Sequence, residues 1–172
     1  MDEKFIEIAI KEAKKAESIG EIPVGAVIVK DNIVLSKAHN LKEKNNCVTK
    51  HAELVAIEKA SKKINSWRLD DCVLYTTLFP CPMCASAIQQ SRIKKIVYIC
   101  DSNSKYIKTN SNNILINYNS NHIVEILKFN FETNLLKTFF KKIRKKWCFT
   151  WNIIFISFLF AFFKQCFTWN IN

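Results

Sequence analysis

The sequence predicts an α/β domain in which helices cover the faces of a partly parallel sheet. Apolar residues repeat at helical spacing over residues 3–18. Short runs rich in β-branched residues recur further along the chain, with helical segments between them. Between residues 33 and 100 the expected order is strand, helix, strand, helix, strand. A helix that joins two strands of one sheet favours parallel pairing.

The N-terminal elements have clear boundaries. Lys and Glu fill the polar side of the first helix, and Gly20 follows its last turn. Two strands are expected at 24–30 and 33–37. Asp31-Asn32 between them suits a two-residue hairpin turn.

The middle of the chain alternates between helices and strands. Thr49 is a plausible N-cap for a helix over 49–62. Residues 72–77 are expected to form a buried strand, and a proline opens the next helix, over 82–90. Residues 96–100 are expected to form a fourth strand. Beyond it, the Asn- and Ser-rich stretch 102–121 is interpreted as a long loop.

The C-terminal part is expected to contain a short strand at 122–128 and a basic amphipathic helix over 134–146. Seventeen uncharged residues follow at 147–163. We therefore predict a domain over 1–146 and an apolar aromatic extension over 147–172. The extension could associate with a membrane through 147–163, which is not the favoured interpretation. It could also pack on the protein, or have no role.

Composition limits the functional classes. The 26 basic and 15 acidic residues give a net charge of +11, which suits a polyanionic partner, RNA above all, or an anionic membrane surface. Hydrophobic residues make up 49% of the chain, which argues against disorder. Seven cysteines, with no secretory signal before them, argue against a disulfide framework and favour the cytoplasm.

Two short motifs carry the chemistry. His51 belongs to a His-Ala-Glu sequence, and Cys81 and Cys84 to a Pro-Cys-Pro-Met-Cys sequence. One imidazole and two thiolates supply three corners of a tetrahedral zinc site and leave the fourth for water, as in a catalytic site. Glu53 is placed to transfer protons. A zinc-activated water with a neighbouring carboxylate suits hydrolytic removal of an amino group from an aromatic ring, and this pattern is the zinc nucleobase deaminase signature.

Several further segments resemble the bacterial tRNA adenosine deaminase family. They are EIPVGAVIV at 21–29, HAE at 51–53, WRL at 67–69, LYTTL at 74–78 and SRI at 91–93. The resemblance covers roughly residues 3–100 well and resumes weakly in LLKTFF at 135–140.

The resemblance implies a three-layer α/β/α sandwich with a central five-stranded mixed sheet, as in cytidine deaminases, and a homodimer. It implies that His51, Cys81 and Cys84 hold Zn²⁺, that Glu53 is the catalytic proton carrier, and that Asn40 contacts the flipped-out base. The expected partner is a tRNA anticodon stem-loop, and the expected product is inosine at the wobble position.

Two other functions remain open. A free guanine, cytosine or cytidine deaminase would use the same metal ligands. A catalytically silent, zinc-stabilised RNA-binding subunit is suggested by departures from the family pattern. The family usually has Glu where Phe79 stands, and the chain after Cys100 lacks the glycines of the family's substrate loop.

Overall fold

The computed structural model describes residues 2–102, 104–117, 120–131 and 133–143. Met1–Thr133 forms one compact unit, and a second unit begins at Asn134. The described part of the second unit contains a helix over 135–143. None of the helices in the described ranges is long and apolar enough to cross a membrane. The expected domain boundary at 146 and the apolar segment 147–163 lie outside the described residues and stay predictions.

The first unit is built on a five-stranded mixed sheet. Its elements are α1 (Asp2–Ser18), β1 (Gly25–Lys30), β2 (Ile33–His39), α2 (Ala52–Ile64), β3 (Val73–Leu78), α3 (Pro82–Gln90), β4 (Lys95–Cys100), α4 (Lys105–Leu115) and β5 (Glu125–Lys128). The strand order is β2-β1-β3-β4-β5. β1 is antiparallel to both of its neighbours, whereas β4 is parallel to β3 and β5. The predicted mixed sheet is confirmed.

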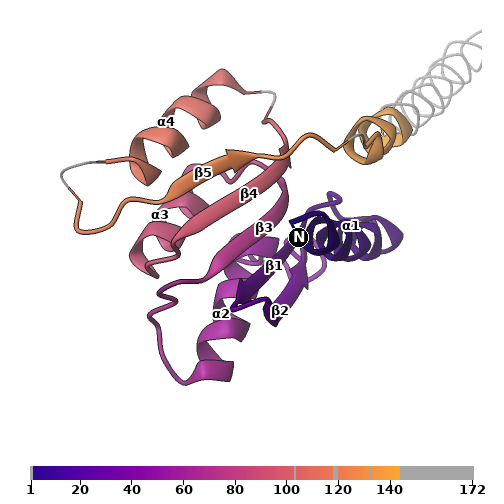
Figure 1. Ribbon diagram of the computed structural model, residues 1–172. Coiled ribbons are helices and arrows are strands. Elements are labelled where there is room, and N and C mark those ends of the chain that lie inside the picture. The colour runs from indigo at the N-terminus through magenta and orange to yellow at the C-terminus, as the bar shows by residue number, and fades with distance from the viewer. Residues whose placement is uncertain (1, 103, 118–119, 132, 144–172) are drawn as a thin grey trace, which may run out of the picture. The chain divides into compact units, whose positions relative to one another are not determined.

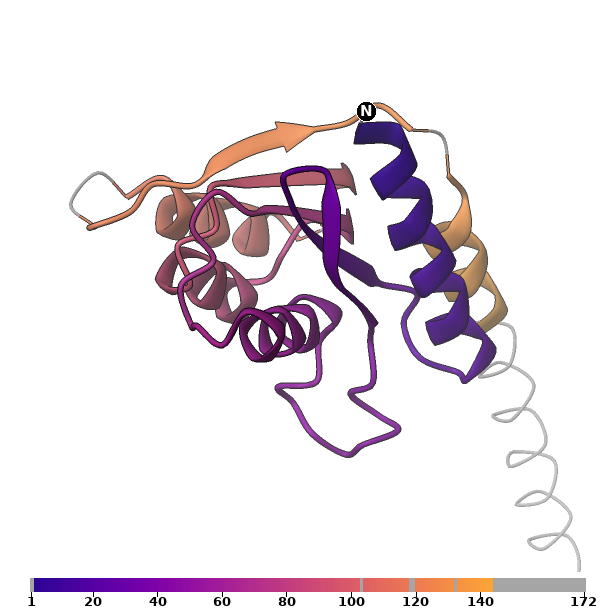
Figure 2. The same cartoon turned by 60° about the horizontal axis from the view of Figure 1, so that its bottom comes forward.

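Helices cover both faces of this sheet (Figures 1 and 2). α1 packs on one face, where Phe5 and Ile6 join the buried side chains of Val27 and Tyr75. α2, α3 and α4 lie on the other face, and their apolar residues form a second core with the opposite sides of the strands. Two cores separated by one sheet make a three-layer α/β/α sandwich, as expected from the family resemblance.

The hairpin between β1 and β2 forms as predicted, because Asp31 and Asn32 both adopt positive φ angles, 51° and 62°. The predicted N-cap of α2 is wrong. His51, with φ −69° and ψ 151°, occupies that position instead of Thr49. The Thr49 hydroxyl lies 3.2 Å from Cys47 Sγ, within a turn that precedes the helix.

The interpretation of residues 102–121 as one long loop is also wrong, because α4 lies within it. The Ser104 hydroxyl accepts a hydrogen bond from the Ile107 N–H and so caps the helix. Ser111 and Leu115, one turn apart, are fully buried. Residues 109–113 of α4 are Thr, Asn, Ser, Asn and Asn, which have low helix propensity, so the composition of the segment suggests a loop.

The close approach of α1 to β1 depends on Gly25. A Cβ atom at this position would lie 2.0 Å from the Ala9 carbonyl oxygen and 2.6 Å from the Ala13 nitrogen, both backbone atoms. The backbone of α1 cannot give way as a flexible side chain would. Only glycine therefore fits between helix and strand here.

We predict that Gly25→Ala lowers the free energy of unfolding by about 1–3 kcal/mol, the usual range for overpacking. Urea denaturation would measure the change. Gly20→Asn is the matched control, because nothing lies within 4 Å of a Cβ at Gly20 and Asn tolerates its φ of +82°. Equal stability of Gly25→Ala and the parent chain would contradict this packing.

Candidate active site

The three predicted metal ligands lie at the starts of two helices. His51 is the N-cap of α2, Cys81 is the N-cap of α3, and Cys84 lies in the first turn of α3. β2 and β3 are both antiparallel to β1 and therefore run in the same direction. Their C-terminal ends therefore lie at the same edge of the sheet, and the helices that follow them begin there. This topology brings together ligands that are about thirty positions apart in sequence.

The ligand atoms have the spacing of a tetrahedral zinc site. His51 Nδ1 lies 3.7 Å from Cys81 Sγ and 3.5 Å from Cys84 Sγ, and all three atoms lie within 4.8 Å of one another. Zinc bonds to nitrogen and sulfur at about 2.0–2.3 Å, with tetrahedral angles, separate ligand atoms by about 3.5–3.8 Å. The donor set and its spacing therefore fit Zn²⁺.

The two sulfurs differ in their affinity for protons. The hydrogen bond from Cys84 and the contact with His51 lower the pKa of the Cys81 thiol to about 4. Burial acts in the opposite direction but is outweighed. The hydrogen bond to Cys81, burial and the nearby Glu53 raise the pKa of the Cys84 thiol. The two shifts favour a thiolate at Cys81 and a thiol at Cys84. A bound divalent cation would compensate the negative charges of two thiolates.

Glu53 lies beside the ligands in the first turn of α2. Its side chain is buried, with a residue exposure of 4%, and it lies next to Cys84. Burial, and then the negative charge of Cys81, raise the pKa of the Glu53 carboxyl above its usual value. A raised pKa makes the Glu53 carboxylate a stronger proton acceptor than an ordinary glutamate, as a group that transfers protons in catalysis needs.

Asn40 directly follows β2 at the same sheet edge, and a glutamate orients its side chain. Asn40 Nδ2 donates to Glu21 Oε2 at 2.9 Å, and Glu21 Oε1 accepts from the Lys44 N–H at 2.7 Å. A carboxylate can only accept hydrogen bonds, so the Asn40 nitrogen must face Glu21, and its Oδ1 points elsewhere. Glu21 is 1% exposed. Sequence reasoning assigns it no role, since a glutamate before a strand is usually solvated.

The two departures from the family pattern have structural explanations. Phe79 is buried, and its ring packs edge-on against Tyr98 with the centroids 4.8 Å apart. It therefore fills the core. After Cys100, Asp101 accepts from the Tyr98 hydroxyl and forms ion pairs with Lys108 and Lys128. The segment that begins α4 is thus anchored to β4 and β5.

We predict that the purified full chain holds about one zinc ion per molecule and that Cys84→Ser lowers this content severalfold, because a hydroxyl group is a poor zinc ligand. Elemental analysis after dialysis would measure it. Cys47→Ser is the control, since Cys47 lies in the turn before α2 and outside the ligand cluster. Equal zinc in both variants would remove Cys84 from the site.

Known proteins resemble this chain over the region that contains the candidate active site. The family model for the cytidine and deoxycytidylate deaminase zinc-binding region matches residues 1–100. The tRNA-specific adenosine deaminase of Bacillus subtilis is 40% identical over 148 residues, which are 84% of this chain and 92% of that protein. The corresponding protein of Aquifex aeolicus is 47% identical over 96 residues, 56% of this chain and 64% of that protein.

Solved structures agree with the sequence relatives. A structure from work on A-to-I editing by tRNA:A34 deaminases has a TM-score of 0.65 and 30% identity, covering 74% of this chain and 98% of that chain. Guanine deaminase from Bacillus subtilis has a TM-score of 0.57 and 31% identity, covering 83% and 93%. This chain belongs to the tRNA-specific adenosine deaminase family, within the zinc-dependent cytidine and deoxycytidylate deaminases.

Proposed function

We propose that this chain hydrolyses adenosine to inosine at the wobble position of a tRNA anticodon. The observation that carries the proposal is the convergence of His51, Cys81, Cys84 and Glu53 at one sheet edge. The choice of substrate rests on the 40% identity to a tRNA-specific adenosine deaminase across 92% of its length. The excess of basic residues suits an RNA substrate.

The reaction consumes water and adenosine and yields inosine and ammonia. When bound, Zn²⁺ acts as a Lewis acid that lowers the pKa of water to about 7. We assign Glu53 the proton transfer: its carboxylate accepts a proton from the attacking water and donates it to the departing amino nitrogen. The buried position of Glu53 next to Cys84 excludes bulk water from this exchange.

Asn40 is assigned to the base. Because Glu21 holds its Nδ2, the amide presents its oxygen and its second N–H in a fixed orientation. A fixed donor and acceptor pair can select one base edge over another. Glu21 then acts as a positioning residue, since it reaches the substrate only through Asn40.

The partner that we propose is the tRNA anticodon stem-loop, with the enzyme acting as a homodimer in the cytoplasm. The family resemblance supports the dimer.

A second candidate function is deamination of free guanine, which the 31% identity to a guanine deaminase structure favours. The assay that separates the two functions offers the full chain a tRNA with adenosine at the wobble position and, separately, guanine, cytosine and cytidine. Inosine in the anticodon supports our proposal, whereas ammonia from the free compounds alone supports the alternative. A zinc-loaded chain without either product would be the silent subunit.

We predict that Glu53→Gln keeps its zinc and loses at least about 100-fold in kcat, since the amide cannot carry the proton. Inosine formation and elemental analysis measure the two quantities. Glu58→Gln is the matched control, because Glu58 lies on the same helix and forms only exposed ion pairs with Lys50 and Lys62. Undiminished turnover in Glu53→Gln would exclude Glu53 as the proton carrier.

A double-mutant cycle tests the role of Glu21. Glu21→Gln keeps an oxygen that accepts from the Lys44 N–H but presents an amide NH2 group to Asn40. The Asn40 side-chain amide must then flip so that its oxygen faces this group. We expect each of Glu21→Gln and Asn40→Ala to lower kcat/KM about 10–100-fold, a common cost of losing an outer partner. In the Asn40→Ala background, Glu21→Gln should add little. Fully additive losses would show that Glu21 acts independently of Asn40.

A further inference from the structure

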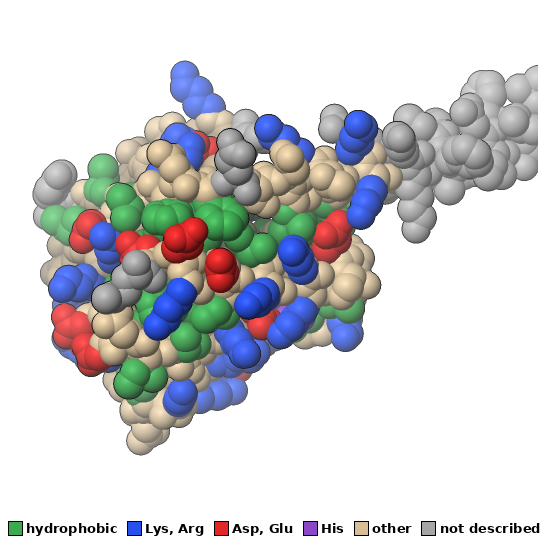
Figure 3. All heavy atoms as spheres, turned by 45° about the vertical axis from the view of Figure 1, so that its right-hand side comes forward, with side chains coloured by type: hydrophobic (Ala, Val, Ile, Leu, Met, Phe, Trp, Pro, Cys, Tyr) green, Lys and Arg blue, Asp and Glu red, His purple; other side chains and the backbone are tan. Residues whose placement is uncertain are grey.

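A groove of about 660 Å³ lies between α1 and the edge strand β2. Its lining includes four lysines, namely Lys11 and Lys15 from α1, Lys37 from β2 and Lys63 from α2. All four side chains are exposed. Figure 3, which brings the α1 side of the domain forward, shows Lys and Arg side chains gathered on this face, with fewer Asp and Glu between them.

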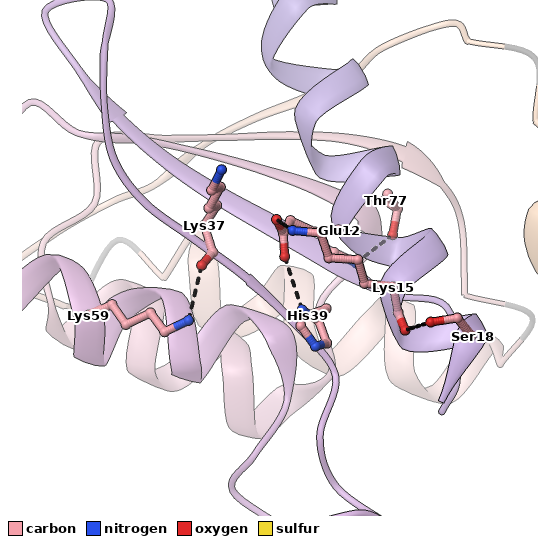
Figure 4. Close-up of polar contacts among 8 residues, drawn as sticks. Glu12, Lys15, Ser18, Lys37, His39, Lys59 and Thr77 are labelled. Carbon is pink, nitrogen blue, oxygen red and sulfur yellow. Dashed lines mark hydrogen bonds and ion pairs between the residues drawn. The ribbon is translucent and has the colours of Figure 1, made fainter. Parts of the chain in front are cut away.

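Glu12, the one carboxylate among the described residues that line the groove, is already paired with Lys15 and His39. Glu12 pairs with Lys15 Nζ at 2.7 Å and with His39 Nδ1 at 3.0 Å, so this histidine has a partner that the sequence does not reveal. Figure 4 shows this contact between α1 and β2. Lysine and histidine contacts outweigh burial and lower the pKa of the Glu12 carboxyl, which is therefore ionised at neutral pH.

The other three lysines of the groove are not paired with a carboxylate in the described part of the chain. Among the described residues, Lys11, Lys37 and Lys63 form no ion pair with a carboxylate, and Lys63 donates only to the Val34 carbonyl oxygen. Lys59 donates in the same way to the Lys37 carbonyl oxygen, while the Lys37 side chain points away from that bond (Figure 4). These two bonds occupy outer carbonyl groups of β2, so another strand cannot pair freely with this edge.

The groove runs beside β2, whose C-terminal end lies next to the candidate active site. β2 ends at His39, and Asn40 follows it at the sheet edge that carries the zinc ligands. At about 3.3 Å per strand residue, Lys37 lies roughly 10 Å and Val34 roughly 20 Å along the strand from Asn40. The unpaired lysine nearest to Asn40 along the strand is therefore Lys37, and the groove extends along β2 away from Asn40.

We propose that this groove binds the sugar–phosphate backbone of the RNA strand whose adenosine enters the active site. The inference rests on the proposed function for its substrate, and on the groove for the location of the contact. A groove lined by separate cations suits a nucleic-acid strand, because the negative charges of the strand lie on separate phosphate groups. An anionic membrane, the other polyanion to consider, is a flat surface and would need a broad cationic face on the protein. It would contact only the lysines at the rim of the groove.

The test uses the full chain with Lys11→Gln, Lys37→Gln and Lys63→Gln combined. The matched control combines Lys14→Gln, Lys62→Gln and Lys94→Gln, exposed lysines outside the groove that remove the same charge. Fluorescence anisotropy measures tRNA binding across a series of KCl concentrations. Phosphatidylcholine vesicles that contain phosphatidylserine form the second arm.

Loss of three phosphate contacts should make the slope of log affinity against log salt shallower by about 2, at about 0.7 per contact, and should weaken binding at least about 10-fold in 0.1 M salt. The control should change the affinity less than about threefold. Equal losses in both variants, or no loss in the groove variant, would overturn the proposal. Loss of vesicle binding with tRNA binding intact would also overturn it.

Failure of the groove and failure of the proposed function give different results. If the parent chain forms inosine in tRNA while the groove variant binds tRNA like the control, only the groove inference fails. If the parent chain forms no inosine but the groove variant loses salt-dependent tRNA binding, the RNA surface stands and the proposed reaction fails.

Discussion

The active site depends on one topological constraint: β2 and β3 run in the same direction, so α2 and α3 begin at the same edge of the sheet. His51 and Cys81 are the N-caps of these helices. Unpaired N–H groups and the positive end of each helix dipole face the cluster, and both favour deprotonated sulfur. An antiparallel arrangement of β2 and β3 would place these residues at opposite edges and would destroy the site.

The same edge holds the polar groups that surround the ligands. Glu53 follows His51 by less than one helical turn, so any motion of the start of α2 moves both. Asn40 is attached to the end of β2 and is oriented by Glu21, a buried carboxylate whose two oxygens are both occupied. Burial of such a group is costly unless it is hydrogen-bonded, so this contact defines one arrangement of the loop around Lys44. The fold therefore connects the metal-ligand cluster with Glu53 and Asn40, the residues that we propose as proton carrier and base contact.

Sequence reasoning predicted the metal ligands and most elements, because these depend on local signals. Pro82 marks the start of α3, and Asp31-Asn32 marks the hairpin, as found. The failures arise where tertiary contacts decide. Thr49 has the chemistry of an N-cap, yet its hydroxyl contacts Cys47 in a preceding turn. α4 is rich in Asn and Ser, whose helix propensity is low, and its burial against the domain is what stabilises it as a helix. The roles of Glu21 and of the Glu12–His39 pair depend on contacts between distant segments, which no local pattern records.

We expect His51, Cys81 and Cys84 to bind one zinc ion whose fourth ligand is an oxygen or nitrogen atom. X-ray absorption spectroscopy at the zinc edge of the purified full chain would determine these ligands. The spectrum should show two sulfur neighbours at about 2.3 Å and two nitrogen or oxygen neighbours at about 2.0–2.1 Å. A spectrum with four sulfur neighbours, or with no sulfur at all, would contradict it.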